Sequence, residues 1–313
     1  MSSQFKIIFA GSGEFGLPTL RALREAGHEI VQIFSQPDRP AGRGRKLTPT
    51  PVAQYAIDQN LPLVRTANIN AEQLPSADVM VVIAFGQKIA DAVVHHPRLG
   101  SVNLHASRLP KYRGAAPINA AILQGESVTG NSIIRLAQKM DAGTILGQSS
   151  IRIGELETAG ELHDRLAEDG APLMLSVLTS LANGTAPEIS QDESAATIAP
   201  KMSRASAEID WSQSAEFIAR KIRALYPWPG CRVRILDIEQ NEIARLTLVR
   251  ARPARSGSSR PPSEITDRLT VIAGDAMEVE IVEVQPEGKR PMPLSAYRNG
   301  HRWECGMRLE SIT

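Results

Sequence analysis

The chain is poor in cysteine and in aromatic residues. Cys231 and Cys305 are the only cysteines among 313 residues, and aromatic side chains make up 4% of the sequence. Two cysteines this far apart argue against a disulfide-rich scaffold and against a zinc site built from cysteine ligands. We therefore expect a protein of a reducing compartment.

Long apolar runs and a strong net charge are absent as well. No stretch approaches the roughly 18 apolar residues of a membrane-spanning helix, and no signal peptide is visible before the first predicted strand, which begins by Phe5. The formal net charge of +1 excludes a general polyanion binder. We expect a cytoplasmic protein without a membrane segment, which would contact nucleic acid only through local basic patches.

The first half of the chain alternates strand-like and helix-like segments. Strands are predicted over residues 6–10, 29–35, 78–85 and 100–105, and a helix over 17–26. The continuous Val/Ile/Met-rich run of 78–85 is typical of a strand buried on both faces of a parallel sheet. The alternation predicts a Rossmann-like, doubly wound and mostly parallel sheet.

A later helix is marked by a capping box. Thr158 and Glu161 have the spacing of this motif, and an apolar stripe follows them up to Leu181. Gly170 and Pro172 predict an interruption or a kink in the helix.

The composition changes at about residue 183. Gly, Pro, Ser, Ala and Thr dominate up to residue 200 without periodicity, which is typical of a linker. A helix and several short β-like runs follow, and they predict a small β-barrel or sandwich. We therefore predict a first domain over 1–189, a linker over 190–207 and a second domain over 208–313.

Asn103 and His105 are the most informative pair of residues. Both lie in the predicted strand 100–105, and a strand's alternation puts their side chains on one face. Ser107 and Pro110 then predict a turn, which places the pair at the carboxyl end of the strand, where open α/β sheets have their sites. An isolated Asn-x-His is more often packed in a core, but the turn favours a functional site.

Asp141 completes a set of groups suited to acyl transfer. It lies in a Met-Asp-Ala-Gly segment between predicted strands over 132–136 and 144–153. We assign Asn103 as a donor to an oxyanion, His105 as a donor and proton shuttle, and Asp141 as the group that orients the imidazole and accepts the proton. Loss of one oxyanion donor typically costs on the order of 100- to 1000-fold in rate.

A glycine-rich turn offers a competing interpretation. Residues 11–16, Gly-Ser-Gly-Glu-Phe-Gly, satisfy the dinucleotide-binding pattern between a strand and a helix. The acidic residue expected to end the second strand is missing, because Phe34-Ser35-Gln36-Pro37 stands there and Asp38 opens a loop. We interpret the glycines as a tight turn, and an NAD-dependent oxidoreductase stays an alternative.

Several motifs together carry a resemblance to a known family. The chain resembles the formyltransferases that use 10-formyltetrahydrofolate in Asn103-x-His105, Ser107-Arg-Leu-Pro110, Arg113-Gly-Ala-Ala-Pro117 and Asp141. Within that family, the loop 36–52 and the segments 201–211 and 222–230 resemble methionyl-tRNA formyltransferases, so the likeness covers nearly the whole chain. The resemblance implies formyl transfer from 10-formyltetrahydrofolate to the α-amino group of initiator methionyl-tRNA, with no metal and no NAD. It also implies a Rossmann-type catalytic domain followed by an OB-like barrel that binds tRNA.

The resemblance also implies roles for individual residues. The catalytic residues would be Asn103, His105 and Asp141. The folate-binding residues would be the turn Ser107, Arg108, Leu109 and Pro110 and the pocket residues Phe85 and Gly86. Arg108 stands where the family usually has leucine, so one apolar contact or a contact with the folate tail is expected to differ. Ser12-Gly13 stands where the family usually has Thr-Pro, and this departure creates the dinucleotide-like pattern, which weakens the NAD interpretation further.

A basic loop supplies the expected contacts with RNA. Residues 37–50 contain one acidic residue, Asp38, and four basic residues, which gives a local net charge of +3; the basic residues are Arg39, Arg43, Arg45 and Lys46. We expect Arg43 near the first base pair of the acceptor stem and Arg45 and Lys46 on phosphates. Further backbone contacts are expected in the second domain, from Lys221, Arg223, Arg232 and Arg234.

Two other functions stay open beside the oxidoreductase. One is a sugar-nucleotide or other small-amine formyltransferase, which the basic loop and the β domain disfavour. The other is a non-catalytic RNA-binding module, which would leave the polar trio without a task. We expect a monomer.

Overall fold

The computed structural model describes residues 4–41, 44 and 46–312. The chain forms two compact units. The first comprises Met1–Gly114, Thr129–Ile151 and His163–Ile198, and the second comprises Ala115–Val128, Arg152–Leu162 and Ala199–Thr313. None of the helices in the described part of the chain combines the length and the apolar character of a transmembrane segment.

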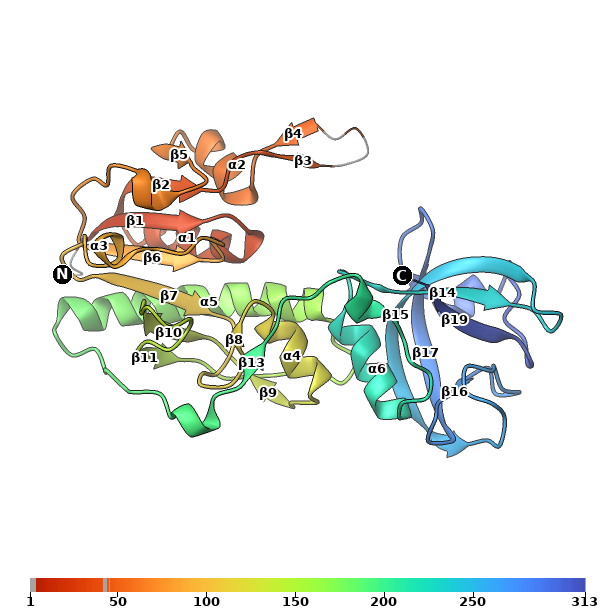
Figure 1. Cartoon of the computed structure of the whole chain (residues 1–313). Helices are drawn as coiled ribbons and strands as arrows, with labels where there is room; N and C mark the ends of the chain where they lie inside the picture. Colours follow the sequence, from red (N-terminus) through yellow and green to blue (C-terminus); the bar gives the residue numbers. More distant parts are fainter. Residues whose placement is uncertain (1–3, 42–43, 45, 313) are drawn as a thin grey trace. The chain divides into compact units, whose positions relative to one another are not determined.

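A seven-stranded sheet is the centre of the first unit (Figure 1). Its strand order is β11-β10-β7-β6-β1-β2-β5. The strands β5, β2, β1, β6 and β7 are parallel to one another. At one edge, β10 runs antiparallel to β7, and β11 runs antiparallel to β10. Their bounds are β1 Lys6–Gly11, β2 Glu29–Ser35, β5 Leu63–Arg65, β6 Val79–Ile83, β7 Ser101–His105, β10 Ser132–Arg135 and β11 Ile145–Gln148. The prediction of a doubly wound, mostly parallel sheet is confirmed.

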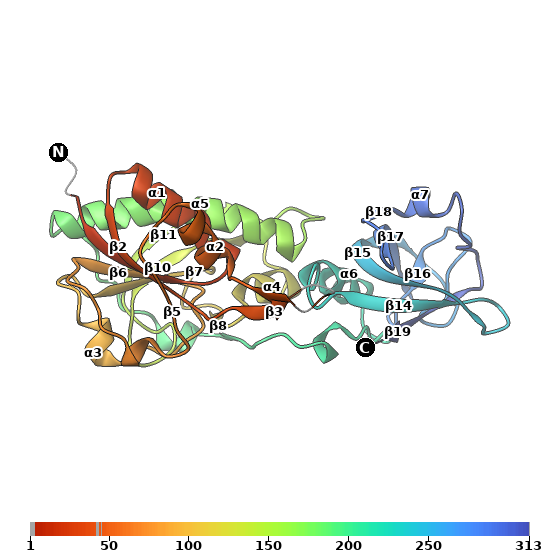
Figure 2. The same cartoon turned by 90° about the horizontal axis from the view of Figure 1, so that it is seen from above.

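Helices cover both faces of this sheet. Figure 2 shows α1 and α5 on one side and α3 on the other. The helices that follow strands of the first unit are α1 Leu17–Glu25, α2 Pro51–Asp58, α3 Asp91–Val94 and α5 Ala159–Ala182. Short strand pairs complete the element order: β3 Arg39–Ala41 with β4 Lys46–Thr48, β8 Arg113–Gly114 with β13 Ile198–Ala199, and β9 Val128–Thr129 with β12 Ile151–Arg152.

Helix α5 starts at the predicted capping box. The backbone N–H of Thr158 donates to Glu161 Oε2 at 3.0 Å, and the N–H of Glu161 donates back to Thr158 Oγ1 at 3.4 Å. The predicted interruption is wrong, because the helix runs through Gly170 and Pro172. Gly170 serves packing instead: a Cβ there would lie 2.6 Å from Leu104 Cδ2.

The glycine-rich turn after β1 is a packing device. A Cβ on Gly11 would lie 2.7 Å from Phe9 Cε1 and 2.9 Å from the carbonyl oxygen of Ile83, and one on Gly16 would lie 3.1 Å from Phe9 Cζ. Both glycines thus let the strand-to-helix turn pack closely on Phe9. This packing supports the interpretation of the motif as a tight turn.

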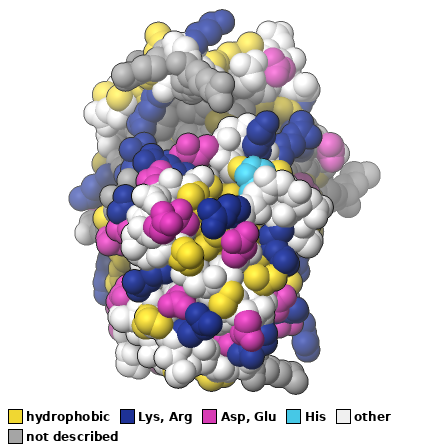
Figure 3. Space-filling model, turned by 90° about the vertical axis from the view of Figure 1, so that its right-hand side faces the viewer, with side chains coloured by type: hydrophobic (Ala, Val, Ile, Leu, Met, Phe, Trp, Pro, Cys, Tyr) yellow, Lys and Arg dark blue, Asp and Glu magenta, His cyan; other side chains and the backbone are white. Residues whose placement is uncertain are grey.

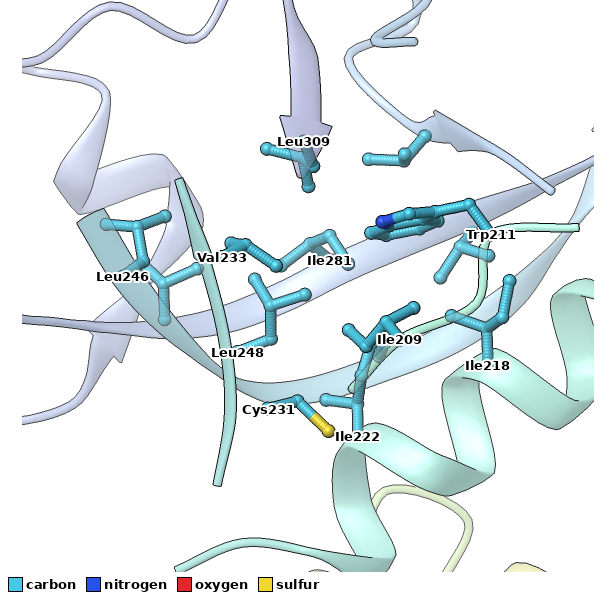
Figure 4. Packing of buried hydrophobic residues seen from close by; sticks show 14 of the residues in the cluster. Ile209, Trp211, Ile218, Ile222, Cys231, Val233, Leu246, Leu248, Ile281 and Leu309 are labelled. Carbon is cyan, nitrogen blue, oxygen red and sulfur yellow. The ribbon is translucent and has the colours of Figure 1, made fainter. Parts of the chain in front are cut away.

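The second unit is a curled antiparallel sheet of the half-barrel kind, as predicted. Its order is β16-β17-β15-β14-β19, with β18 paired to β17. Its elements are α4 Pro117–Leu123, α6 Ala215–Ala224, β14 Cys231–Leu236, β15 Glu242–Gly257, β16 Val271–Ile272, β17 Met277–Pro286, β18 Met292–Pro293, α7 Leu294–Tyr297 and β19 Arg308–Ile312. Figure 4 shows the core between α6 and the strands, where Ile218 and Ile222 of the helix meet Leu248 and Ile281 of the sheet.

A buried carboxylate ties three segments of the second unit together. The side chain of Glu278 is fully buried and accepts hydrogen bonds from Arg268, from Thr270 Oγ1 at 2.6 Å and from Ser256 Oγ at 2.7 Å. The hydrogen bond from Arg268, followed by those from Thr270 and Ser256, lowers the pKa of Glu278 to about 2.

The stabilisation from ionised Glu278 is therefore present above the ordinary carboxyl pKa of 4.5 and is lost as the pH falls toward 2. We expect Glu278→Gln to melt several degrees below the wild type near neutral pH and to lose less stability on acidification. Thermal unfolding followed by circular dichroism at several pH values measures this. The control is Glu280→Gln, whose partly exposed carboxylate pairs with Arg252, and which should melt like the wild type. Equal acid sensitivity of Glu278→Gln and the wild type would contradict the assignment.

Candidate functional site

The imidazole of His105 lies at the carboxyl end of β7 and faces a carboxylate. The residue is buried, and its Nδ1 lies 3.7 Å from Asp141 Oδ2. Its Nε2 lies 2.8 Å from the carbonyl oxygen of Tyr112. Because a carbonyl oxygen can only accept a hydrogen bond, Nε2 carries a proton and donates a hydrogen bond to the carbonyl oxygen of Tyr112. In the neutral ring, Nδ1 is then the basic nitrogen, and it is the one that faces Asp141.

Asp141 lies in the connection between β10 and β11, with a left-handed backbone at φ 52°. Its Oδ2 accepts a hydrogen bond of 2.8 Å from the backbone N–H of Gly114. Its own carbonyl oxygen accepts one of 2.7 Å from Gln191 Nε2. A non-glycine residue rarely adopts this conformation without such support. The carboxylate is therefore fixed from both its side chain and its backbone.

Asn103 shares a face of β7 with His105. Leu104 between them points toward Gly170 of α5, so the two polar side chains lie on the opposite face of the sheet. Asn103 is half-buried, with Ile134 of β10 as its register partner on one side. Among the described residues, no hydrogen bond occupies its side-chain amide. The amide is thus an available donor beside the imidazole.

The turn predicted to bind folate is held rigidly by Ser132. Ser132 Oγ donates to the carbonyl oxygen of Ser107 at 2.6 Å and accepts from the N–H of Leu109 at 3.0 Å. Gln148 Nε2 adds a bond of 2.9 Å to the carbonyl oxygen of Leu109. The Leu109 side chain packs in a small buried cluster, whereas Arg108 is exposed. Pro110 ends the predicted turn, and its carbonyl oxygen accepts from the N–H of Thr197.

Phe85 and Gly86 follow β6. The ring of Phe85 is buried in the core of the first unit, whereas Gly86 is exposed with φ at 75°. Gln36 Nε2 donates to the carbonyl oxygens of both residues, at 3.1 and 3.4 Å. Gly86 is therefore the exposed member of the pair and the one open to a ligand.

Of the predicted RNA contacts in the basic loop, only Lys46 can be placed. It is exposed on β4, and Arg43 and Arg45 lie outside the described residues. In the second unit, Arg232 and Arg234 form ion pairs with acidic partners. The other two basic residues expected to contact RNA in this unit also have partners. Lys221 donates to the carbonyl oxygen of Glu208, and Arg223 donates to that of Glu157.

Three residues near the site, Tyr112, Gln191 and Glu193, were not singled out from the sequence, and a fourth, Arg113, was named there only as part of a motif. Tyr112 orients the imidazole through its carbonyl oxygen, and the buried Arg113 donates to Gln191 and Glu193. Gln191 and Glu193 fall in the predicted linker, so no periodicity marked them. The usable signal was Arg113, which Gly-Ala-Ala-Pro follows, because an arginine that is buried requires acceptors.

Comparison with known proteins decides the family. The formyl transferase model matches residues 5–178, and the model of the formyl transferase C-terminal domain matches residues 201–302. The methionyl-tRNA formyltransferase of Methylococcus capsulatus is 41% identical over 305 residues, which are 95% of this chain and 97% of that protein. The chain belongs to the methionyl-tRNA formyltransferase family. The family member from Acidiphilium cryptum is 40% identical over 311 residues, which are 97% of this chain and 99% of that protein.

A solved structure shares the fold at lower identity. WlaRD, a sugar 3N-formyl transferase solved in the presence of dTDP and 5-N-formyl-THF, has a TM-score of 0.65 at 18% identity, and the match covers 92% of this chain and all of WlaRD. Methionyl-tRNA formyltransferases are formyl-transferring enzymes, so the predictions of the family and of the enzyme class are confirmed. The oxidoreductase and the non-catalytic RNA-binding module are set aside.

The glycine of the Met-Asp-Ala-Gly segment generates a prediction. A Cβ on Gly143 would lie 1.8 Å from the carbonyl oxygen of Arg135, so Gly143→Ala must displace the backbone next to Asp141. We expect destabilisation of about 1–3 kcal/mol and a loss of turnover on the order of 100-fold, because small misplacements of reacting groups are costly. Thermal unfolding and a formylation assay measure the two effects.

The matched control is Gly13→Ala in the same unit. A Cβ on Gly13 meets only Ala84 Cβ, at an ordinary 3.8 Å. This variant should keep the melting temperature and turnover of the wild type. A Gly143→Ala variant as active as this control would contradict the account.

Proposed function

We propose that this chain transfers the formyl group of 10-formyltetrahydrofolate to the α-amino group of initiator methionyl-tRNA, with Asn103, His105 and Asp141 as its catalytic residues. The reaction class follows from the family. The assignment to these residues is carried by one observation: the basic nitrogen of a buried imidazole faces a fixed carboxylate at the carboxyl end of β7.

Asn103 and His105 are suited to stabilise developing negative charge. When bound, 10-formyltetrahydrofolate supplies an electrophilic formyl carbon. As the amine of the aminoacyl ester forms its bond to that carbon, negative charge develops on the formyl oxygen. The available amide N–H of Asn103 is a donor for this oxygen, and Nδ1 of His105 becomes a second donor once it has taken the proton of the amine; such donors are typically worth on the order of 100- to 1000-fold each.

His105 and Asp141 are suited to move the proton. The attacking amine loses one proton as the new C–N bond forms, and Nδ1 is the ring nitrogen with a free lone pair. The imidazolium so formed is stabilised by the carboxylate of Asp141, 3.7 Å away. The proton then passes to the folate nitrogen as its bond to the formyl carbon breaks, which regenerates the neutral ring and releases tetrahydrofolate.

The turn after β7 and the residues after β6 are suited to hold the folate. We assign the folate contacts to the rigid turn from Ser107 to Pro110 and to Phe85 and Gly86 after β6, of which Gly86 is exposed. The half-buried amide of Asn103, which forms no hydrogen bond with the described residues, supports a polar ligand group at this edge of the sheet. Arg108 is exposed on the turn, where a cation can reach an acidic part of the folate.

The catalytic assignment predicts large losses of turnover. His105→Ala and Asp141→Asn should each lower kcat at least about 100-fold, as expected for general acid–base groups, while circular dichroism shows an intact fold. The assay mixes enzyme, 10-formyltetrahydrofolate and charged initiator tRNA and detects the N-formylated aminoacyl ester. Sugar amines tested in place of the tRNA examine the remaining alternative. Near-normal turnover in either variant would remove that residue from the mechanism.

We further propose that the basic loop and the second unit bind the tRNA, the loop through Arg43, Arg45 and Lys46. The second unit offers mixed charge on the side that Figure 3 shows, where dark blue and magenta side chains are interspersed. Because Arg232 and Arg234 are neutralised by acidic partners, the loop is the stronger candidate for phosphate contacts. The domain bounds 1–189, 190–207 and 208–313, a monomeric state and a cytoplasmic location stay predictions.

Removal of loop charges should change how RNA affinity depends on salt. Arg45→Gln combined with Lys46→Gln should flatten the plot of log affinity against log salt concentration by about one unit of slope per lost phosphate contact. The control is Arg98→Gln. Arg98 pairs with Asp78. Asp78 precedes β6 and Arg98 precedes β7, so the pair lies at the amino-terminal end of these parallel strands, whereas His105 lies at the carboxyl end. The slope of this control should equal that of the wild type, and an unchanged slope in the loop variant would exclude the loop from phosphate binding.

A further inference from the structure

Gln191 joins the buried Arg113 to the backbone that carries Asp141. Its Nε2 donates to the carbonyl oxygens of Asp141 and Gly143, at 2.7 and 2.8 Å. Its Oε1 accepts from Nε and Nη2 of Arg113, at 3.0 and 2.8 Å. All four bonds lie within the first unit and leave no hydrogen of the amide unused.

The orientation of this amide is fixed by its partners. Arg113 has only donors, so the oxygen of Gln191 must face it, and the carbonyl groups of Asp141 and Gly143 only accept, so the nitrogen must face them. A flipped amide would bring donor against donor and acceptor against acceptor. The arrangement therefore has one orientation, and that orientation fixes the backbone on both sides of Ala142.

The charge of Arg113 is balanced by a different residue. Glu193 accepts from Arg113 at 2.8 Å and also pairs with Lys139. Hydrogen bonds from Arg113 and then from Lys139 lower the pKa of Glu193 to about 2, so the carboxylate is ionised at neutral pH. Gln191 therefore does not neutralise the charge of Arg113, and its contacts serve geometry alone.

We propose that Gln191 is a positioning residue, which holds residues 141–143 so that the Asp141 carboxylate faces His105. This inference rests on the proposed function. The left-handed backbone of Asp141 needs an external hold, and Gln191 supplies it through the carbonyl oxygen of that residue. Arg113 in turn fixes Gln191, which gives the Arg-Gly-Ala-Ala-Pro motif a role in aligning the site.

The sharpest test is Gln191→Glu, which changes one atom. The new carboxylate keeps the contact with Arg113 but places an oxygen without hydrogen against two carbonyl oxygens. We expect kcat to fall on the order of 10- to 100-fold, with KM for folate and for tRNA changed by no more than about twofold, because Gln191 is not among the residues proposed above to contact folate or tRNA. Glu193→Gln is the matched control. It removes the negative charge that balances Arg113 but leaves both hydrogen bonds from Gln191 Nε2 in place, so it should keep kcat.

A double variant separates this inference from the proposed function. If Gln191 acts through Asp141, Gln191→Glu should lower kcat no further when added to Asp141→Asn. Losses that multiply, or a normal kcat in Gln191→Glu while Asp141→Asn is slow, would overturn the positioning role alone. A normal kcat in Asp141→Asn would instead overturn the proposed function. Gln191→Met, of similar volume, repeats the test if Gln191→Glu does not fold, and misfolding of both would refute a role confined to the site.

Discussion

The contact between the His105 imidazole and the Asp141 carboxylate is the interaction on which the proposed chemistry depends. Neither group is placed by its own segment of the chain alone. The ring is turned by the carbonyl oxygen of Tyr112, which holds the proton on Nε2 and leaves Nδ1 as the base. The carboxylate is held by the N–H of Gly114 and by a left-handed backbone. The fold therefore directs a basic nitrogen and an anion toward each other before any substrate arrives, which lowers the cost of reorganisation during the reaction.

The surrounding sheet explains why this contact can be held. β7 has α5 packed on one face, where Gly170 admits Leu104, and so its polar residues point to the other face. On that other face the connections from β7 and β10 meet the segment after α5, and hydrogen bonds from Arg113 and Gln191 join them. Buried polar networks of this kind are rigid when every member is satisfied. The site thus draws its geometry from segments that are distant in sequence.

Local patterns allowed much of this to be predicted. The Val/Ile-rich run of β6, the alternation along β7 and the capping box at Thr158 depend on short-range chemistry, and the structure confirms each. The continuous course of α5 did not follow from the sequence, because the close approach of Leu104 to Gly170 is a tertiary contact. Gln191 was missed for the same reason: a polar residue in an aperiodic segment gives no signal until its partners are known. The orientation of the imidazole likewise depends on a backbone carbonyl seven residues along the chain.

The central claim is that His105 and Asp141 act as one unit, and a double-mutant cycle on kcat tests it most directly. The account predicts that the variant carrying both His105→Ala and Asp141→Asn is no slower than the slower of the two single variants, because each change alone already disables the pair. Losses that multiply in the double variant would contradict it, since the two residues would then contribute independently.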